Sequence, residues 1–435
     1  MKWLNTQDAA FAAEFAALTD ERQTESARVD APVAEILATV RRSGDAALCE
    51  YTARFDHMEL TAGQLRITAE EVDAACAEVS GELLAAVDLA ASRIEAFHKA
   101  QLPEDFRFTD QDGLTLGQRW TPLDAAGLYV PGGKAAYPSS VLMNAIPARV
   151  AGVKRLAMCV PTPHGTLNPL VLAAARRAGV TEIYRVGGAQ AIGAMAYGTQ
   201  SIAPVDRIVG PGNAWVAEAK RQVFGRVGID SIAGPSEVVV LADGQNDPRL
   251  TALDLLAQAE HDELAQSILI TTDEAFASRV FDAVDAELTR LSRASIAGAS
   301  WRDFGGIIIV RSWDEAAALV DQIAPEHLEL MLDNPEEVFA KISHAGAAFL
   351  GRFCPEAVGD YVGGPNHVLP TSRTARFSSG LSVYDFMKRT TFIAGGPEAL
   401  RRVGPAGAAI ARAEGLEAHA LSISARLDMI DGQNN

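Results

Sequence analysis

The sequence predicts an α/β fold in which two doubly wound parallel sheets carry helices on both faces, with a helical segment before them and a small helical lobe after them. From about residue 125 to residue 350, short apolar segments alternate with helical stretches, which is the pattern of strand–helix–strand units. A Gly- or Pro-rich turn follows each of the first four of these segments. The chain has 435 residues, which is enough for two or three domains.

The first hundred residues have only helical periodicity. Phe11, Phe15 and Leu18 recur at the spacing that places them on one face of a helix. Thr68 followed by Glu71 forms a capping box, which opens a helical region that extends to about residue 101. These helices contain no chemical motif, so we expect them to serve in packing.

Nine short apolar segments are expected to be strands. In chain order they are Gly127–Val130, Leu156–Val160, Glu182–Val186, Arg207–Val209, Val238–Leu241, Ile268–Thr271, Ile307–Val310, His327–Met331 and Ala347–Leu350. The turns after the first four are Pro131-Gly132-Gly133, Pro161-Thr162-Pro163, Gly187-Gly188 and Gly210-Pro211-Gly212. Because helical stretches separate the strands, the strands of each sheet should be parallel.

These elements divide the chain into four expected parts. Residues 1–25 form a helical arm, and residues 125–239 form one continuous Rossmann-like module. Residues 26–124 and 240–380 together form a second Rossmann-like module, to which the earlier segment contributes helices. Residues 381–435 show no strand alternation and are expected to form a small helical lobe.

The glycine turns make the 125–239 module a candidate dinucleotide site. Ligands of open parallel sheets bind beyond the carboxyl ends of the strands, where a missing side chain lets backbone N–H groups approach an anion. The GxGxxG pattern is absent, and the segment from Gly187 to Gly193 is the nearest approach to it. The pattern alone therefore leaves open whether this module binds a nucleotide.

Composition argues against some classes of partner. The net charge is −18, from 38 basic and 56 acidic residues, whereas nucleic acids and anionic membranes require clustered positive charge. We therefore expect neither nucleic acid nor membrane as a partner. No apolar run is long enough to cross a bilayer, and the N-terminus lacks the features of a secretory signal. The four cysteines are scattered and form no CxxC pair, which indicates reduced thiols and a cytoplasmic protein.

Two of the eight histidines have chemically useful neighbours in the middle of the chain. Gln258 and His261 are three residues apart on an expected helix and share a face, so they could bind one cation or form an exposed turn. Glu326 and His327 open an expected strand, where they could be proton-transfer partners or part of a solvated loop.

Two further histidines lie near carboxylates late in the chain. Asp360 and His367 belong to a Gly-rich segment, which is typical of a binding loop and also of a plain turn. Glu414 and His419 lie in the C-terminal lobe, where they could act together or simply be exposed. The remaining histidines are expected to be surface or hydrogen-bonded imidazoles, and they are His57, His98, His164 and His344.

Taken together, eight segments resemble the histidinol dehydrogenase family. They are Gly127–Gly133, Val186–Ile192, Val209–Ala214, Ala233–Val238, Gln258–His261, Pro325–Glu329, Gly364–Pro370 and Glu414-Gly415-Leu416 leading to His419. These segments fall in the family's order and at its approximate spacing, from about residue 127 to residue 419. A chance match to the whole series is implausible.

The resemblance implies a zinc- and NAD-dependent enzyme that oxidises L-histidinol to L-histidine through a bound aldehyde. It implies one zinc ion per subunit with the ligands Gln258, His261, Asp360 and His419. Its acid–base pair would be Glu326 and His327. Besides His327 and the zinc ligands, the substrate would contact Ser236, His367 and Glu414, and NAD would contact Tyr129, Gln190 and Asn213. Members of the family are homodimers, which implies a site shared between two subunits.

The chain departs from the family pattern at Glu263, where a proline is usual, and after His419, while residues 1–120 match only weakly. Two other interpretations remain open. One is a paralogous NAD-dependent dehydrogenase of another small alcohol, such as a sulfonated diol, and the retained substrate residues argue against it. The other is a non-catalytic protein that binds a small polar ligand, and the Glu326-His327 pair argues against that.

Overall fold

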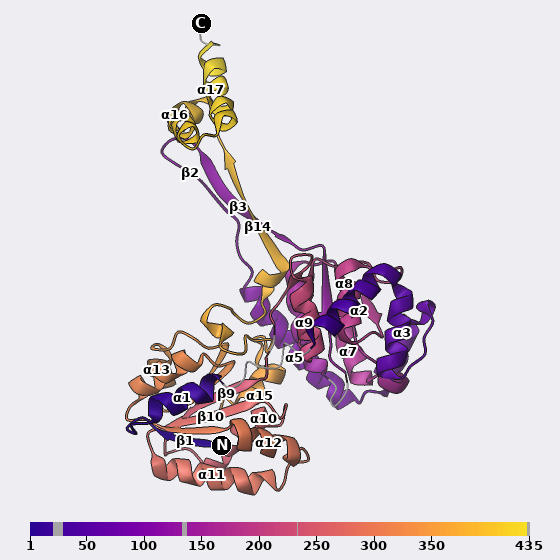
Figure 1. Cartoon of the computed structure of the whole chain (residues 1–435), viewed down its shortest axis with the longest axis vertical. Coiled ribbons are helices and arrows are strands. Elements are labelled where there is room, and N and C mark those ends of the chain that lie inside the picture. Colours follow the sequence, from indigo (N-terminus) through magenta and orange to yellow (C-terminus); the bar gives the residue numbers. More distant parts are fainter. Residues whose placement is uncertain (21–28, 133–136, 233, 433–435) are drawn as a thin grey trace. The chain divides into compact units, whose positions relative to one another are not determined.

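The computed structural model describes residues 1–20, 29–132, 137–232 and 234–432 (Figure 1). The chain forms two compact units. The larger comprises Met1–Gln101 and Leu123–Phe386, and the smaller comprises Leu102–Pro122 and Met387–Asn435. In the described part of the chain, no helix is both long and apolar enough to cross a membrane.

The first sheet of the larger unit has five parallel strands in the order β6-β5-β4-β7-β8. Their bounds are β4 (Ala125–Tyr129), β5 (Arg155–Cys159), β6 (Glu182–Tyr184), β7 (Arg207–Val209) and β8 (Gly228–Ile229). Four helices connect them: α6 (Pro138–Ala151), α7 (Pro169–Ala178), α8 (Gly188–Tyr197) and α9 (Ala214–Val223). Every residue of β4 is buried, as expected for a strand covered on both faces. The four strands expected here are confirmed, and β8 was not anticipated.

The N-terminal helices pack against the helices that cover this first sheet. They are α2 (Asp30–Ser43), α3 (Asp45–Asp56), α4 (Ala69–Glu78) and α5 (Gly81–Ala100). Val33, Leu37 and Val40 of α2 lie in one core cluster with Tyr129 and the apolar residues of α8. This differs from the expected assignment of residues 26–124 to the second module. Helical periodicity shows that a face is buried, but it does not show which partner buries it.

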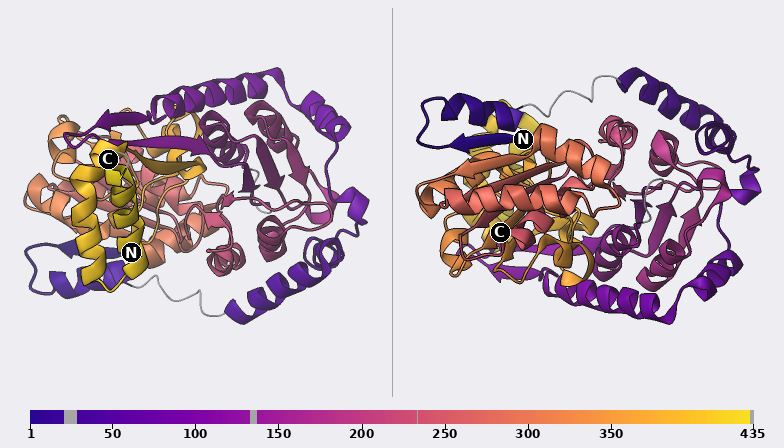
Figure 2. Two further views of the ribbon diagram at one scale, coloured as in Figure 1. Left: turned by 90° about the horizontal axis from the view of Figure 1, so that it is seen from above. Right: turned by 90° about the horizontal axis from the view of Figure 1, so that it is seen from below.

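The second sheet of the larger unit has six parallel strands in the order β1-β11-β10-β9-β12-β13. Their bounds are β1 (Lys2–Asn5), β9 (Glu237–Ala242), β10 (Gln266–Thr271), β11 (Gly306–Ile309), β12 (His327–Met331) and β13 (Ala347–Leu350). The helices are α1 (Phe11–Asp20), α10 (Pro248–Ala259), α11 (Glu274–Leu288), α12 (Ala294–Phe304), α13 (Trp313–Ile323) and α14 (Pro335–Phe339). Figures 1 and 2 show that helices flank the strands on both sides. Alternate residues of β9 accordingly enter two separate core clusters.

Two expectations about this second sheet need correction. The helical arm expected over residues 1–25 begins instead with β1, which pairs with β11 at the sheet edge; residues 21–25 of that arm lie outside the described residues. The module boundary expected at residue 239 cuts through β9, which pairs with β10 and β12. The first module therefore ends before Glu237, because a strand belongs to the sheet that satisfies its backbone hydrogen bonds.

The smaller unit combines two helices with a three-stranded antiparallel sheet. The strands are β2 (Phe106–Thr109), β3 (Thr115–Pro122) and β14 (Met387–Ala394), and the helices are α16 (Pro397–Ala413) and α17 (Glu417–Gly432). The helices match the expected C-terminal lobe, but the sheet was not anticipated. Nearly every residue of β2 and β14 is exposed, so their sequences carry no alternation of buried and exposed positions.

Candidate active site

Glu326 and His327 lie where β12 begins, next to the start of β9. The backbone of Glu237, the first residue of β9, binds both. Its N–H donates to Oε2 of Glu326 at 3.0 Å, and its carbonyl accepts from Nδ1 of His327 at 3.1 Å. Just before the pair, Ala324 adopts a left-handed conformation with φ of 48°, which only a well-determined surrounding structure sustains. Strand pairing thus orients both side chains.

The hydrogen bond to Glu237 determines which nitrogen of His327 can act as a base. A carbonyl can only accept, so Nδ1 carries the proton and the neutral ring presents its lone pair at Nε2. Nε2 is buried, without a hydrogen-bond partner among the described residues, and lies 3.8 Å from Oδ1 of Asp360. Burial lowers the pKa of His327 to about 3, which keeps the ring neutral near physiological pH. Nε2 is therefore available to take a proton from a bound substrate.

Two carboxylates from one short segment lie beside His327. Glu356 opens α15 (Glu356–Val358), and its Oε1 is 3.6 Å from Nδ1 of His327. Asp360 follows in a π-helical turn (Gly359–Gly363), a conformation that occurs mostly at functional sites. Arg93 of α5 anchors this turn by donating to the carbonyls of Val362 and Gly363 at 2.5 and 3.1 Å. Helix α5 therefore supports the site.

Burial makes this group of carboxylates costly to ionise. It raises the pKa of Asp360 to about 7. Burial, together with the neighbouring carboxylates of Asp360 and Glu329, also raises the pKa of Glu356 well above its usual range. A bound cation would favour the charged forms of these groups.

The donor types of the expected ligands fit a zinc ion. Gln258 is fully buried at the end of α10, and neither polar atom of its carboxamide has a hydrogen-bond partner among the described residues. His261 follows three residues later. Oxygen and nitrogen donors of these types suit Zn²⁺. A second set is also close: ligand atoms of His327, Glu356 and Asp360 lie within 4.8 Å of one another. That set would leave the carboxamide of Gln258 unsatisfied.

Glu326 and Asp360 lie beside His327, and His261 and His367 are near enough for their charges to act on the pKa of His327. His367 lies in the loop after the π-helical turn, and burial lowers its pKa to about 4. Ser236 directly precedes β9 and is partly buried. Glu414 at the end of α16 and His419 in α17 are exposed and belong to the smaller unit. Gly133 and Ala233, which belong to the two glycine motifs of the resemblance, lie outside the described residues.

The three residues expected to bind NAD lie at or just after the carboxyl ends of strands β4, β6 and β7 of the first sheet. Tyr129 ends β4, and its hydroxyl accepts from the N–H of Gly188 at 3.1 Å. Gln190 is buried, and its Oε1 has no partner among the described residues. Asn213 caps α9 through its side-chain oxygen. The turns after β4 and β7 meet at the point where the strand order reverses, which is where open parallel sheets bind dinucleotides.

A buried ion pair that the sequence did not reveal braces the turn before Asn213. Nζ of Lys220 donates to the carbonyl of Gly210 at 3.0 Å, and Oδ2 of Asp230 accepts from the N–H of Gly210 at 2.8 Å. Lys220 and Asp230 also pair with each other. At Gly210 a Cβ would lie 2.1 Å from the carbonyl oxygen of Tyr129, so only glycine fits. A lysine in a helix normally indicates a solvent-facing position, so no sequence signal marked this one.

Glu237 and Glu356 were also missed as site residues. Glu237 acts through its backbone, which leaves no trace in its residue type. Glu356 lies in the same Gly-rich segment as Asp360, and that proximity was the one available signal.

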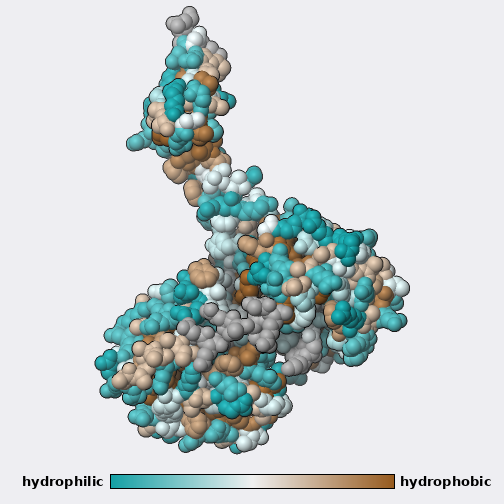
Figure 3. Space-filling model, in the orientation of Figure 1, coloured by the Kyte–Doolittle hydropathy of each residue, from teal (hydrophilic) through white to brown (hydrophobic). Residues whose placement is uncertain are grey.

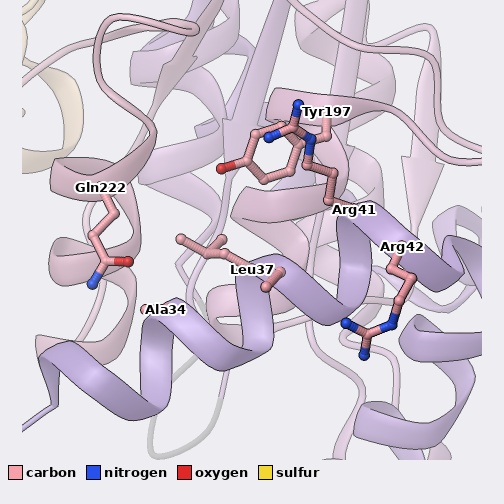
Figure 4. A pocket seen from close by; sticks show the side chains of 7 residues that line it. Ala34, Leu37, Arg41, Arg42, Tyr197 and Gln222 are labelled. Carbon is pink, nitrogen blue, oxygen red and sulfur yellow. The ribbon is translucent and has the colours of Figure 1, made fainter.

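One pocket on the surface contains none of the candidate site residues. It has a volume of about 330 Å³ and lies among α2, α8 and α9 (Figure 4). Arg41, Tyr197 and Gln222 are among its lining residues, and the Arg41 guanidinium lies 5.6 Å from the centre of the Tyr197 ring. None of the lining residues belongs to the expected catalytic, metal or NAD set.

The fold and the site define an α/β protein with two parallel-sheet modules. One sheet has a carboxyl edge of the kind that binds dinucleotides, and the other carries a buried histidine whose Nε2 has no partner among the described residues. The histidinol dehydrogenase family model matches residues 19–427. Histidinol dehydrogenase of Gluconobacter oxydans is 69% identical over 98% of this chain and 100% of its own length. That of Ruegeria pomeroyi is 61% identical, over 99% and 100%. The crystal structure of histidinol dehydrogenase from Elizabethkingia anophelis has a TM-score of 0.95 at 38% identity and covers 99% of both chains. The chain belongs to the histidinol dehydrogenase family.

Proposed function

We propose that this protein oxidises L-histidinol to L-histidine with two molecules of NAD, through L-histidinal that stays bound. The observation that carries this proposal is the orientation of His327, whose Nδ1 is bonded to the Glu237 carbonyl and whose Nε2 is left as a buried base. Membership of the histidinol dehydrogenase family supports the choice of substrate.

The acid–base pair has two separate roles. Nε2 of His327 takes the hydroxyl proton of the alcohol in the first oxidation and a proton of the hydrated aldehyde in the second. Glu326 activates the water that hydrates the aldehyde. Its Oε2 is already oriented by the N–H of Glu237, so little reorganisation is needed when the water binds.

Zinc is assigned to Gln258, His261, Asp360 and, from the C-terminal lobe, His419. The unsatisfied carboxamide of Gln258 supports this set over the His327, Glu356 and Asp360 group, because a ligated His327 could not also serve as the base. When bound, zinc orients the substrate and polarises its oxygen. Ser236, His367 and Glu414 help to hold the substrate.

NAD is assigned to the edge formed by Tyr129, Gln190 and Asn213. The unsatisfied Oε1 of Gln190 and the braced Gly210 turn support this assignment. NAD accepts one hydride in each oxidation.

The active site is proposed to be shared between two subunits of a homodimer. The smaller unit exposes large apolar side chains, which include Phe106, Phe108, Ile393, Ile410, Leu421 and Met429. Figure 3 shows brown, hydrophobic areas on the surface of its helical end. Such a surface indicates a protein partner, and a second copy of the chain would cover it. The four cysteines are free thiols, which supports the expected cytoplasmic location.

The first test is the stoichiometry of the reaction. Oxidation of an alcohol to an acid removes four electrons, so each L-histidinol should yield two NADH with no free aldehyde. The absorbance of NADH and chromatography of the products measure both. Release of histidinal with one NADH would contradict the proposal, and turnover of a sulfonated diol instead of L-histidinol would favour the paralogous dehydrogenase.

The second test concerns the metal. A chelator should abolish activity and zinc should restore it, because the assigned ligands include no thiolate and lie at the reacting centre. His261→Asn should lose zinc, measured by elemental analysis, whereas His327→Asn should keep it. Loss of zinc in His327→Asn with retention in His261→Asn would instead identify the His327, Glu356 and Asp360 group as the metal site.

A further inference from the structure

Asp56 is the last residue of helix α3. His57 adopts a left-handed conformation with φ of 52°, which turns the chain at this point. Sδ of Met58 accepts from Oγ1 of Thr162 at 3.3 Å, and the ring of His57 stacks on that of His164 with centroids 5.3 Å apart. The segment from Asp56 to Met58 therefore lies against the turn at the carboxyl end of β5.

This position places Asp56 at the edge assigned to NAD. β5 pairs with β4, and Cys159 at the end of β5 is in register with Tyr129. The Asp56 carboxylate is near enough for its charge to add to the effect of burial, which raises the pKa of Tyr129 to about 12. Asp56 and Tyr129 thus approach the same edge of the sheet from different segments of the chain.

The environment of Asp56 disfavours a carboxylate. Oδ2 is buried and accepts no hydrogen bond from any residue that the structure describes. The C-terminal end of a helix carries partial negative charge, which opposes an acidic side chain there. The adjacent His57 is the one group that offsets the effect of burial on the Asp56 pKa. A buried acceptor without a donor requires an explanation, and a ligand with hydroxyl groups would supply the missing donor.

The first module lacks the carboxylate that a dinucleotide-binding unit normally has. In such units an Asp or Glu near the end of the second strand accepts hydrogen bonds from the ribose of NAD. Here β4, α6 and β5 form that unit, and no Asp or Glu occurs between Asp124 and Glu182. The end of β5 continues as Pro161-Thr162-Pro163. Asp56 is the carboxylate that another segment brings to this turn.

We propose that Asp56 binds the ribose hydroxyls of the adenosine half of NAD and makes the enzyme select NAD over NADP. The hydroxyls donate to the carboxylate, and Oδ2 gains the partner it lacks. The 2′-phosphate of NADP would instead meet a negative charge, which disfavours its binding. This assignment rests on the proposed NAD dependence and adds a residue that determines cofactor specificity.

The test uses equilibrium binding by calorimetry of NAD, 2′-deoxy-NAD and NADP to the intact protein. Hydrogen bonds to a charged group are worth about tenfold to a hundredfold in affinity. Wild-type protein should bind 2′-deoxy-NAD about tenfold more weakly than NAD, whereas Asp56→Asn should bind both with similar, reduced affinity. The ratio of the affinity for NAD to the affinity for NADP should be at least about tenfold smaller in Asp56→Asn than in wild-type protein.

Glu59→Gln is the matched control, because it removes an exposed negative charge three residues away and should leave all three affinities unchanged. Equal affinity of wild-type protein for NAD and 2′-deoxy-NAD would overturn the assignment without any variant. If removal of the 2′-hydroxyl of NAD lowered the affinity equally in wild-type protein and in Asp56→Asn, the assignment would also be overturned. Asp56 would then affect binding without contacting that hydroxyl. A wild-type protein that binds no NAD would refute the proposed function itself.

Discussion

His327→Asn is expected to lower kcat by about a hundredfold to ten-thousandfold for both oxidations, because the group that accepts the substrate proton is removed. Asparagine retains a donor for the Glu237 carbonyl, so the local backbone should be preserved. KM for L-histidinol should change little, since the loss concerns the transition state rather than binding. Steady-state kinetics with L-histidinol and with L-histidinal measure the two steps separately.

Two comparisons make this result specific. Glu326→Gln should slow mainly the oxidation of L-histidinal, where water must be activated, and should spare the first hydride transfer. His344→Asn, at a histidine that belongs to none of the expected catalytic, metal or substrate sets, should behave as wild-type protein. If Glu326→Gln stopped oxidation of the alcohol and left that of the aldehyde intact, the two roles would be reversed.

Mixtures of two inactive variants are expected to recover activity. His261→Asn and His419→Asn should each be nearly inactive, because each removes a proposed zinc ligand. If His419 serves the site of the partner subunit, a mixed dimer contains one intact site and one doubly defective site. Unfolding and refolding the two together should then give roughly a quarter of wild-type activity when half of the dimers are mixed.

The control pairs His261→Asn with Gln258→Ala. Both changes lie on or just after α10 of the same module, so no mixed dimer contains an intact site, and activity should stay at background. Recovery by the first pair alone would establish exchange of the C-terminal lobe. A lack of recovery in both, despite confirmed mixed dimers, would place His419 in the site of its own subunit.

Local patterns in the sequence determined the strands and the identity of the candidate residues. The nine expected strands are all present, because buried parallel strands form continuous apolar runs that need no tertiary information to recognise. Gln258, His261, Glu326, His327 and Asp360 were recognised from residue type and family resemblance. The proximity of His327 and Asp360 was not contained in their spacing, because they belong to different elements of the chain.

Tertiary structure decided the partners of each element and the chemical state of each group. The helices of residues 30–100 pack against the helices of the first module, β1 joins the edge of the second sheet, and β2, β3 and β14 form a separate sheet. Nε2 of His327 is the basic nitrogen because Nδ1 is bonded to the carbonyl of Glu237, 90 residues earlier in the chain. The turn at Gly210 is held by Lys220, a lysine that the sequence presents as a surface residue. Backbone groups, burial and unsatisfied atoms such as Oδ2 of Asp56 arise only when distant segments pack together.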